Sequence, residues 1–136
     1  MQRLPSHDAV PTVDDAKNII SELAARDEIL AIILFGSVAR NNARQISDID
    51  ICVVTDKKIP DAESMDILSY GTEKIDVSLF HALPITIRFR VLHEGKILFV
   101  RDRLALNAIM ADTVREYLDI EPFIRRNCNR VLGITQ

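Results

Sequence analysis

The segment Phe35-Gly36-Ser37-Val38-Ala39-Arg40, with Ser47-Asp48-Ile49-Asp50-Ile51 close behind it, decides how this chain folds. Residues 29–35 are almost all apolar, which predicts a strand that is buried on both faces. The strand ends at Gly36, and Ser37 then opens a short predicted helix and loop. Because a helix start carries unpaired N–H groups and partial positive charge, this corner favours a bound phosphate group.

Three aspartates follow on two predicted strands. Residues 48–54 alternate, so that Asp48 and Asp50 share one face with their Cα atoms about 7 Å apart. Residues 74–80 predict another strand, on which Asp76 again lies opposite the apolar side chains. If these strands pair, the three carboxylates converge, and they stay ionised together only around cations. An acidic surface patch is the competing interpretation, but unpaired charge on otherwise apolar strands is costly.

A carboxylate site of this kind predicts magnesium chemistry on a nucleotide. Oxygen ligands select Mg²⁺ or Mn²⁺ over zinc. Two such ions can activate an attacking oxygen and stabilise a leaving one in an in-line displacement at phosphorus. The three histidines have no zinc-ligand spacing with either cysteine, and the chain has no Walker A or G-x-G-x-x-G motif.

The spacing of apolar residues predicts the other elements. Residues 13–26 repeat at helical spacing after Thr12, a candidate N-cap. Residues 61–69 favour a helix with Met65 and Leu68 facing inward. The remaining predicted elements are a helix opened by Pro84 and closed by Gly95, a strand over residues 96–100, and a long helix over residues 106–118 that Pro122 interrupts before the period resumes over residues 123–132.

Composition bounds the class of protein. The length of 136 residues, with 48% apolar and 27% charged residues, predicts one soluble domain with a single core. The net charge of −3 disfavours general nucleic-acid binding, and no apolar run approaches a membrane span. The first residues lack a signal-peptide pattern. Cys52 and Cys128 predict two buried thiols rather than a disulfide, which favours a cytoplasmic location.

The motifs resemble those of a known family. Gly36-Ser37, Ser47-Asp48-Ile49-Asp50 and Lys74-Ile75-Asp76-Val77 are similar to the signature of the DNA polymerase beta-type nucleotidyltransferases. The Gly-Ser-Val-Ala-Arg run and the small size resemble the minimal nucleotidyltransferases, or MNT proteins, which are commonly paired with HEPN ribonuclease toxins. Asn41 departs from the pattern, because many relatives have glycine there. The resemblance implies an α+β fold with a small mixed sheet flanked by helices and C-terminal helices, in a single nucleotidyltransferase domain over residues 1–136.

The resemblance also implies a role for each residue of the motif. Gly36 lets the backbone approach the triphosphate, and Ser37 donates to a phosphate oxygen. Asp48 and Asp50 bridge two Mg²⁺ ions, for which Mn²⁺ can substitute. Asp76 holds only the catalytic ion and helps to remove the proton from the attacking hydroxyl. The implied reaction transfers AMP from ATP to a tyrosine of a cognate HEPN toxin, with which the protein forms a hetero-oligomer.

Two further residues of this region have open roles. Arg40 either contacts phosphate one helical turn beyond Ser37 or pairs with a surface acid. Ser47 either binds phosphate or forms the turn before the strand. Both are candidates for nucleotide binding.

Two alternatives to protein adenylylation remain open. The last third of the chain is basic, which indicates solvated helix faces, or else a surface for an acidic partner or a second phosphate group. The protein could therefore be a non-catalytic antitoxin that neutralises a toxin by binding it. The other alternative is nucleotidyl transfer to a small molecule, although no additional acceptor domain is found in the sequence.

Overall fold

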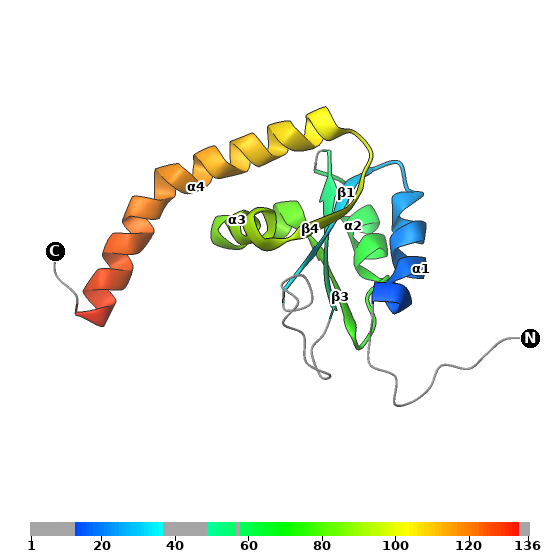
Figure 1. Ribbon diagram of the computed structural model, residues 1–136, viewed down its shortest axis with the longest axis horizontal. Helices are drawn as coiled ribbons and strands as arrows, with labels where there is room; N and C mark the ends of the chain where they lie inside the picture. Colours follow the sequence, from blue (N-terminus) through cyan, green and yellow to red (C-terminus); the bar gives the residue numbers. More distant parts are fainter. Residues whose placement is uncertain (1–12, 37–48, 57, 134–136) are drawn as a thin grey trace, which may run out of the picture.

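The structure is a computed structural model that describes residues 13–36, 49–56 and 58–133. Figure 1 shows its helices and strands. In chain order they are α1 (Val13–Ala24), β1 (Ile29–Phe35), β2 (Ile49–Thr55), α2 (Asp61–Leu68), β3 (Ile75–Leu79), the 3₁₀ helix η1 (Phe80–Ala82), α3 (Ile85–Glu94), β4 (Lys96–Val100) and α4 (Arg103–Leu132).

The four strands form one mixed sheet in the order β3-β2-β1-β4. β1 runs antiparallel to both β2 and β4, whereas β2 and β3 run parallel. The predicted strands over residues 29–35 and 96–100 are confirmed at both ends. The strand predicted from residue 48 is described from Ile49 and extends to Thr55. The expected α+β architecture, a small mixed sheet flanked by helices, is confirmed.

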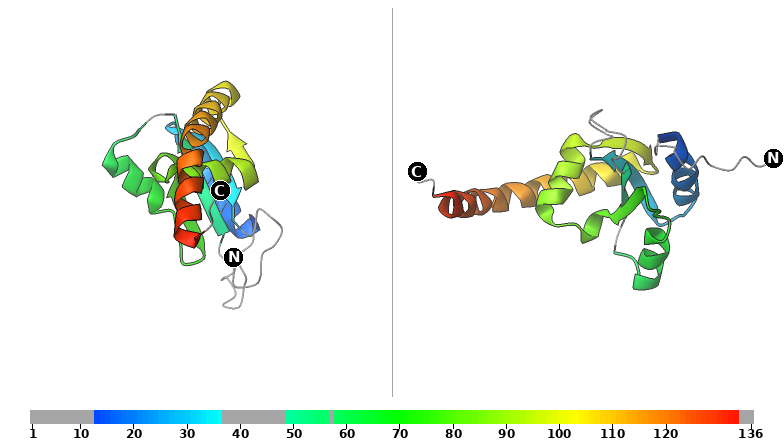
Figure 2. Two further views of the ribbon diagram at one scale, coloured as in Figure 1. Left: turned by 90° about the vertical axis from the view of Figure 1, so that its left-hand side faces the viewer. Right: turned by 90° about the horizontal axis from the view of Figure 1, so that it is seen from below.

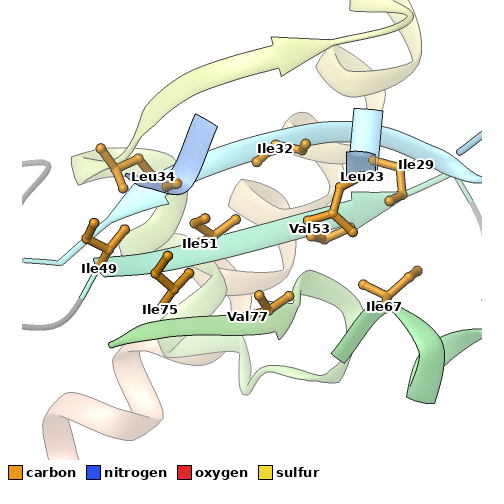
Figure 3. Close-up of a cluster of buried hydrophobic side chains, with 11 residues drawn as sticks. Leu23, Ile29, Ile32, Leu34, Ile49, Ile51, Val53, Ile67, Ile75 and Val77 are labelled. Carbon is orange, nitrogen blue, oxygen red and sulfur yellow. The ribbon is translucent and has the colours of Figure 1, made fainter. Parts of the chain in front are cut away.

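Helices cover both faces of this sheet (Figures 1 and 2). On the face that we call the α1/α2 face, alternate strand residues pack with Leu23 of α1 and Ile67 of α2 in the cluster drawn in Figure 3. On the opposite face, which we call the α3/α4 face, Cys52 and Val54 of β2 pack with Val91 of α3 and Leu106 of α4. Because side chains alternate along a strand, neighbouring residues of β2 belong to different clusters.

α2 buries a different side chain from those predicted. Met65 is 67% exposed and Leu68 is 39% exposed, whereas Ile67 is completely buried. The prediction for Met65 and Leu68 was therefore wrong. Apolar residues lie all around this eight-residue helix, so their period does not select a face. α2 connects the parallel strands β2 and β3, and this crossover sets the side that meets the sheet.

α4 is longer than predicted, because it continues through Pro122 as one helix of 30 residues. The predicted interruption at Pro122 was wrong. Pro122 removes the hydrogen bond to the carbonyl of Leu118, and Leu118 is 62% exposed, so solvent can satisfy that carbonyl. Asp102 caps the start of the helix, because its Oδ1 accepts hydrogen bonds from the backbone N–H groups of Leu104 (3.1 Å) and Ala105 (3.2 Å).

The second half of α4 leaves the rest of the molecule (Figures 1 and 2). We call residues 118–132 the α4 extension. It carries exposed apolar side chains, among them Phe123 at 58% and Val131 at 83%. Cys128 also lies there and is exposed, so the prediction of a second buried thiol was wrong, whereas Cys52 is buried as predicted. Among the described helices, none is both long enough and apolar enough to cross a membrane.

Candidate active site

Two of the three predicted catalytic aspartates lie side by side. Asp50 of β2 pairs with Asp76 of β3 in the parallel register. Neighbouring strands are about 4.8 Å apart, and paired residues of parallel strands point to the same face. Asp76 is exposed and Asp50 is half-buried, so both carboxylates can reach a ligand. The expected convergence of β2 and β3 is observed for this pair.

The flanking side chains identify the face on which these carboxylates lie. Ile49, Ile51, Ile75 and Val77 all belong to the α1/α2 cluster. Asp50 and Asp76 alternate with them, and they therefore lie on the α3/α4 face. Phe35 of β1 pairs with Asp50 and packs against the core of that same face. Phe35, Asp50 and Asp76 thus form a row across three neighbouring strands.

Gly36 brings the backbone against the Asp50 carboxylate. Its φ angle is +87°, a conformation that side-chain-bearing residues rarely adopt. A Cβ atom built at this position would lie 2.4 Å from Oδ2 of Asp50. A side chain at this position would therefore strain the backbone and displace the carboxylate. The close approach places Gly36, a predicted phosphate-binding residue, next to the predicted metal ligand.

A small cavity adjoins this corner. Its volume is about 120 Å³, and it is lined by Phe35 and Gly36 of the sheet and by Ile87, Arg90 and Glu94 of α3. The α3 residues were not among those predicted for the site. Their spacing of three and four residues places them on one face of the helix. This spacing is the feature of the sequence from which their common position could have been predicted.

The remaining predicted site residues lie outside the described residues. They are Ser37, Arg40, Ser47 and Asp48. Within residues 13–36, 49–56 and 58–133, no three His, Cys, Asp or Glu side chains are grouped so that they could hold a metal ion. The described part of the site therefore supplies two carboxylates, and the predicted third ligand, Asp48, directly precedes β2.

The thiol of Cys52 lies on the same face but is not a candidate nucleophile. Burial raises its pKa to about 12, so that the thiol stays protonated at neutral pH. It packs in the core with Val91 and Leu106. Cys52 is therefore a structural residue beneath the site.

A larger hollow lies at the other end of β2. Its volume is about 550 Å³, and Thr55, Lys58 and His81 are among its lining residues. The Nε2–H group of His81 donates to the carbonyl of Thr55 at 2.8 Å, which fixes the imidazole at the rim. Thr55 follows Asp50 by five positions along the strand, a distance of about 16 Å. This hollow is therefore separate from the aspartates.

The sequence places this chain among the nucleotidyltransferases. Residues 17–104 match the polymerase beta nucleotidyltransferase family, and the chain belongs to that family. A protein of Methanocaldococcus jannaschii that is assigned as a protein adenylyltransferase is 31% identical over 100 residues, which make up 74% of this chain and 79% of the relative. The predicted family membership is confirmed.

Solved structures share the fold. One chain of a toxin–antitoxin structure with AMP-PNP has a TM-score of 0.69 at 19% identity, over 85% of this chain and 98% of its own length. Another structure is that of a tri-AMPylated Shewanella oneidensis HEPN toxin in complex with MNT antitoxin. One chain of this complex has a TM-score of 0.64 at 15% identity, over 88% of this chain and 94% of its own length. The predicted polymerase beta-like fold is therefore confirmed over most of the chain.

Proposed function

We propose that this nucleotidyltransferase is an Mg²⁺-dependent protein adenylyltransferase and antitoxin. Its acceptor would be a tyrosine of a HEPN-type toxin encoded beside it. The observation that carries the proposal is the in-register pair of Asp50 and Asp76 beside Gly36. The M. jannaschii relative, assigned as a protein adenylyltransferase, and the structural neighbours from toxin–antitoxin complexes support this acceptor class.

The described carboxylates suit a hard divalent cation. Asp50 and Asp76 offer only oxygen ligands, lie on one face in register, and are both accessible to solvent. In the proposal, Asp48 and Asp50 would hold two Mg²⁺ ions and Asp76 one of them. Bound Mg²⁺ would neutralise phosphate charge and lower the pKa of the attacking hydroxyl.

In the proposed reaction the tyrosine oxygen attacks the α-phosphorus of ATP. A new oxygen–phosphorus bond forms, the bond from the α-phosphorus to the bridging oxygen breaks, and pyrophosphate leaves. Asp76 would accept the hydroxyl proton and release it to solvent, and its exposure lets a side chain of a second protein reach it. Gly36 admits the triphosphate, and Ser37, Arg40 and Ser47 would bind it. The use of ATP accords with the cytoplasmic location expected from the sequence.

The test is AMP transfer to the product of the adjacent gene. Purified protein, ATP and Mg²⁺ should add the mass of AMP to that product, and peptide mass spectrometry should place the addition on tyrosine. Asp50→Asn and Asp76→Asn each remove a charged ligand, so transfer should fall by at least about 100-fold.

Asp66→Asn is the matched control, because Asp66 is an exposed aspartate of α2, on the opposite side of the sheet. Its transfer rate should equal that of the wild type. Absence of transfer by the wild type to the product of the adjacent gene, or equal transfer by the Asp50→Asn variant, would contradict the proposal.

A second candidate function is neutralisation of the toxin by binding alone. The exposed apolar residues of the α4 extension favour it, because such a surface suits contact with a partner protein. Growth of cells that express the toxin separates the two functions. Full protection by the Asp50→Asn variant would favour binding, whereas loss of protection would favour AMP transfer.

A further inference from the structure

Arg90 of α3 is the cation that lines the small cavity beside Gly36. The cavity opens on the face that carries the row of Phe35, Asp50 and Asp76, because Phe35 forms part of its wall. Gly36 also lies against Oδ2 of Asp50, so Arg90 lines the same small cavity as the glycine that contacts this carboxylate.

The end of α3 that carries Arg90 is seated closely on β1. A Cβ atom at Gly95, which follows α3, would lie 2.5 Å from Cγ2 of Ile33 and 3.1 Å from the carbonyl oxygen of Leu34. Val91, next to Arg90, is fully buried in the α3/α4 cluster. The backbone of α3 thus holds position 90 at a defined place above the end of β1.

The present partner of Arg90 holds it loosely. Its Nε atom lies 3.8 Å from Oε2 of Glu94, one helical turn away, which exceeds a hydrogen-bond distance. The Arg90 side chain is 59% exposed. An exposed ion pair of this length contributes little to stability, so the guanidinium can change partner at small cost.

Two other described basic residues of this region, Arg88 and Lys96, lie in different surroundings. Arg88 donates to the Leu83 carbonyl at 3.0 Å and to Glu116 of α4 at 3.1 Å. Lys96 pairs with Leu34, which belongs to the α1/α2 cluster, so Lys96 lies on the opposite face at the same end of the sheet. Of the described side chains that line the cavity beside Gly36, Arg90 is the basic one.

We propose that Arg90 binds the β- and γ-phosphates of the nucleoside triphosphate and that Glu94 holds its side chain when the site is empty. This inference rests on the proposed function, because it requires a triphosphate at Gly36. A guanidinium binds phosphate oxygens through two parallel N–H donors, which the Glu94 contact leaves largely available. Arg90 would thereby position the group that departs as pyrophosphate.

Calorimetric titration of the full chain without an acceptor tests this role. The ligands are α,β-methylene-ATP, which cannot be cleaved at the reacting bond, and AMP, each with Mg²⁺. Arg90→Ala should weaken binding of the triphosphate analogue about 10- to 100-fold and change AMP binding by less than about twofold. Arg90→Lys should restore part of the lost affinity, and Glu94→Gln should bind the analogue at least as tightly as the wild type.

Lys96→Ala is the matched control, because it removes a positive charge at the same end of the sheet but on the other face. It should bind the analogue with nearly wild-type affinity. Equal affinity of the wild type and the Arg90→Ala variant for the analogue would overturn the role of Arg90 and leave the proposed function standing. A wild type that binds no triphosphate would overturn both.

Discussion

Gly36 and Gly133 both have positive φ angles, but their surroundings differ. At Gly36, φ is +87° and Oδ2 of Asp50 occupies the position near a Cβ atom. At Gly133, which ends α4, φ is +75° and no atom lies within 4 Å of a Cβ position. Both glycines have a backbone conformation that would strain another residue, but of these two only Gly36 lies close to the candidate site. A comparison of substitutions at the two positions can therefore distinguish the effect of backbone strain from the effect of close approach.

Substitution of these two glycines should have different effects on activity. Gly36→Ala should lower the free energy of unfolding by about 1–3 kcal/mol and abolish AMP transfer, because the methyl group displaces the Asp50 carboxylate. Gly133→Ala should cost about 1 kcal/mol and leave transfer unchanged. Thermal melting and the transfer assay measure the two effects. Full activity of the Gly36→Ala variant would show that close approach at Gly36 is not required.

The two cysteines should differ in reactivity in the native protein. Cys128 is exposed, whereas Cys52 is buried with its thiol held protonated. At neutral pH, iodoacetamide should modify Cys128 rapidly and Cys52 only after urea unfolds the protein. Peptide mass spectrometry locates the modified residue. Rapid native modification of Cys52 would mean that the α3/α4 face opens readily.

At the scale of elements, α3 links the site to α4. Arg88 bridges to Glu116, and the Phe89 and Tyr117 rings stack with centroids 3.9 Å apart and an angle of 9° between their planes. Together with the close seating of Gly95 on β1, these contacts hold α3 between the sheet and the first half of α4. The position of Arg90 relative to Asp50 therefore depends on packing between three elements.

The two halves of α4 should contribute unequally to stability. Leu106, in the first half, is fully buried, so Leu106→Ala should lower the free energy of unfolding by about 2–5 kcal/mol. Leu118 begins the α4 extension and is 62% exposed, so Leu118→Ala should change the free energy of unfolding by less than about 0.5 kcal/mol. Urea unfolding measures both. Comparable losses would mean that the extension is buried in solution.

At the scale of the whole molecule, the apolar core and the candidate catalytic residues occupy different parts of the sheet. The α1/α2 face is occupied by a continuous apolar cluster, shown in Figure 3. The α3/α4 face has a similar core toward one end, where Cys52 and Val54 pack under the helices, and carries Asp50 and Asp76 at the other end. One alternating strand, β2, supplies residues to both functions. The single domain over residues 1–136 stays a prediction.

Local patterns in the sequence were sufficient to predict the strands and to predict which residues lie on the same face of a strand. The apolar run of β1 and the alternation around Asp50 and Asp76 follow from side-chain geometry within one strand, which does not depend on distant contacts. The sequence also indicated the glycine at the end of β1. The family resemblance then supplied the roles that are expected of Asp50 and Asp76.

Only the tertiary structure decided how these elements meet. The parallel register that places Asp50 beside Asp76, the inward position of Ile67 and the position of Arg90 beside Gly36 all arise from contacts between segments that are distant in sequence. The continuity of α4 through Pro122 depends instead on solvent, which reaches the carbonyl that the proline leaves without a partner. A repeating pattern specifies a helix or strand because the backbone repeats locally. The order of strands, their register and the buried side of a short helix depend on which surfaces meet, and that is a property of the folded chain as a whole.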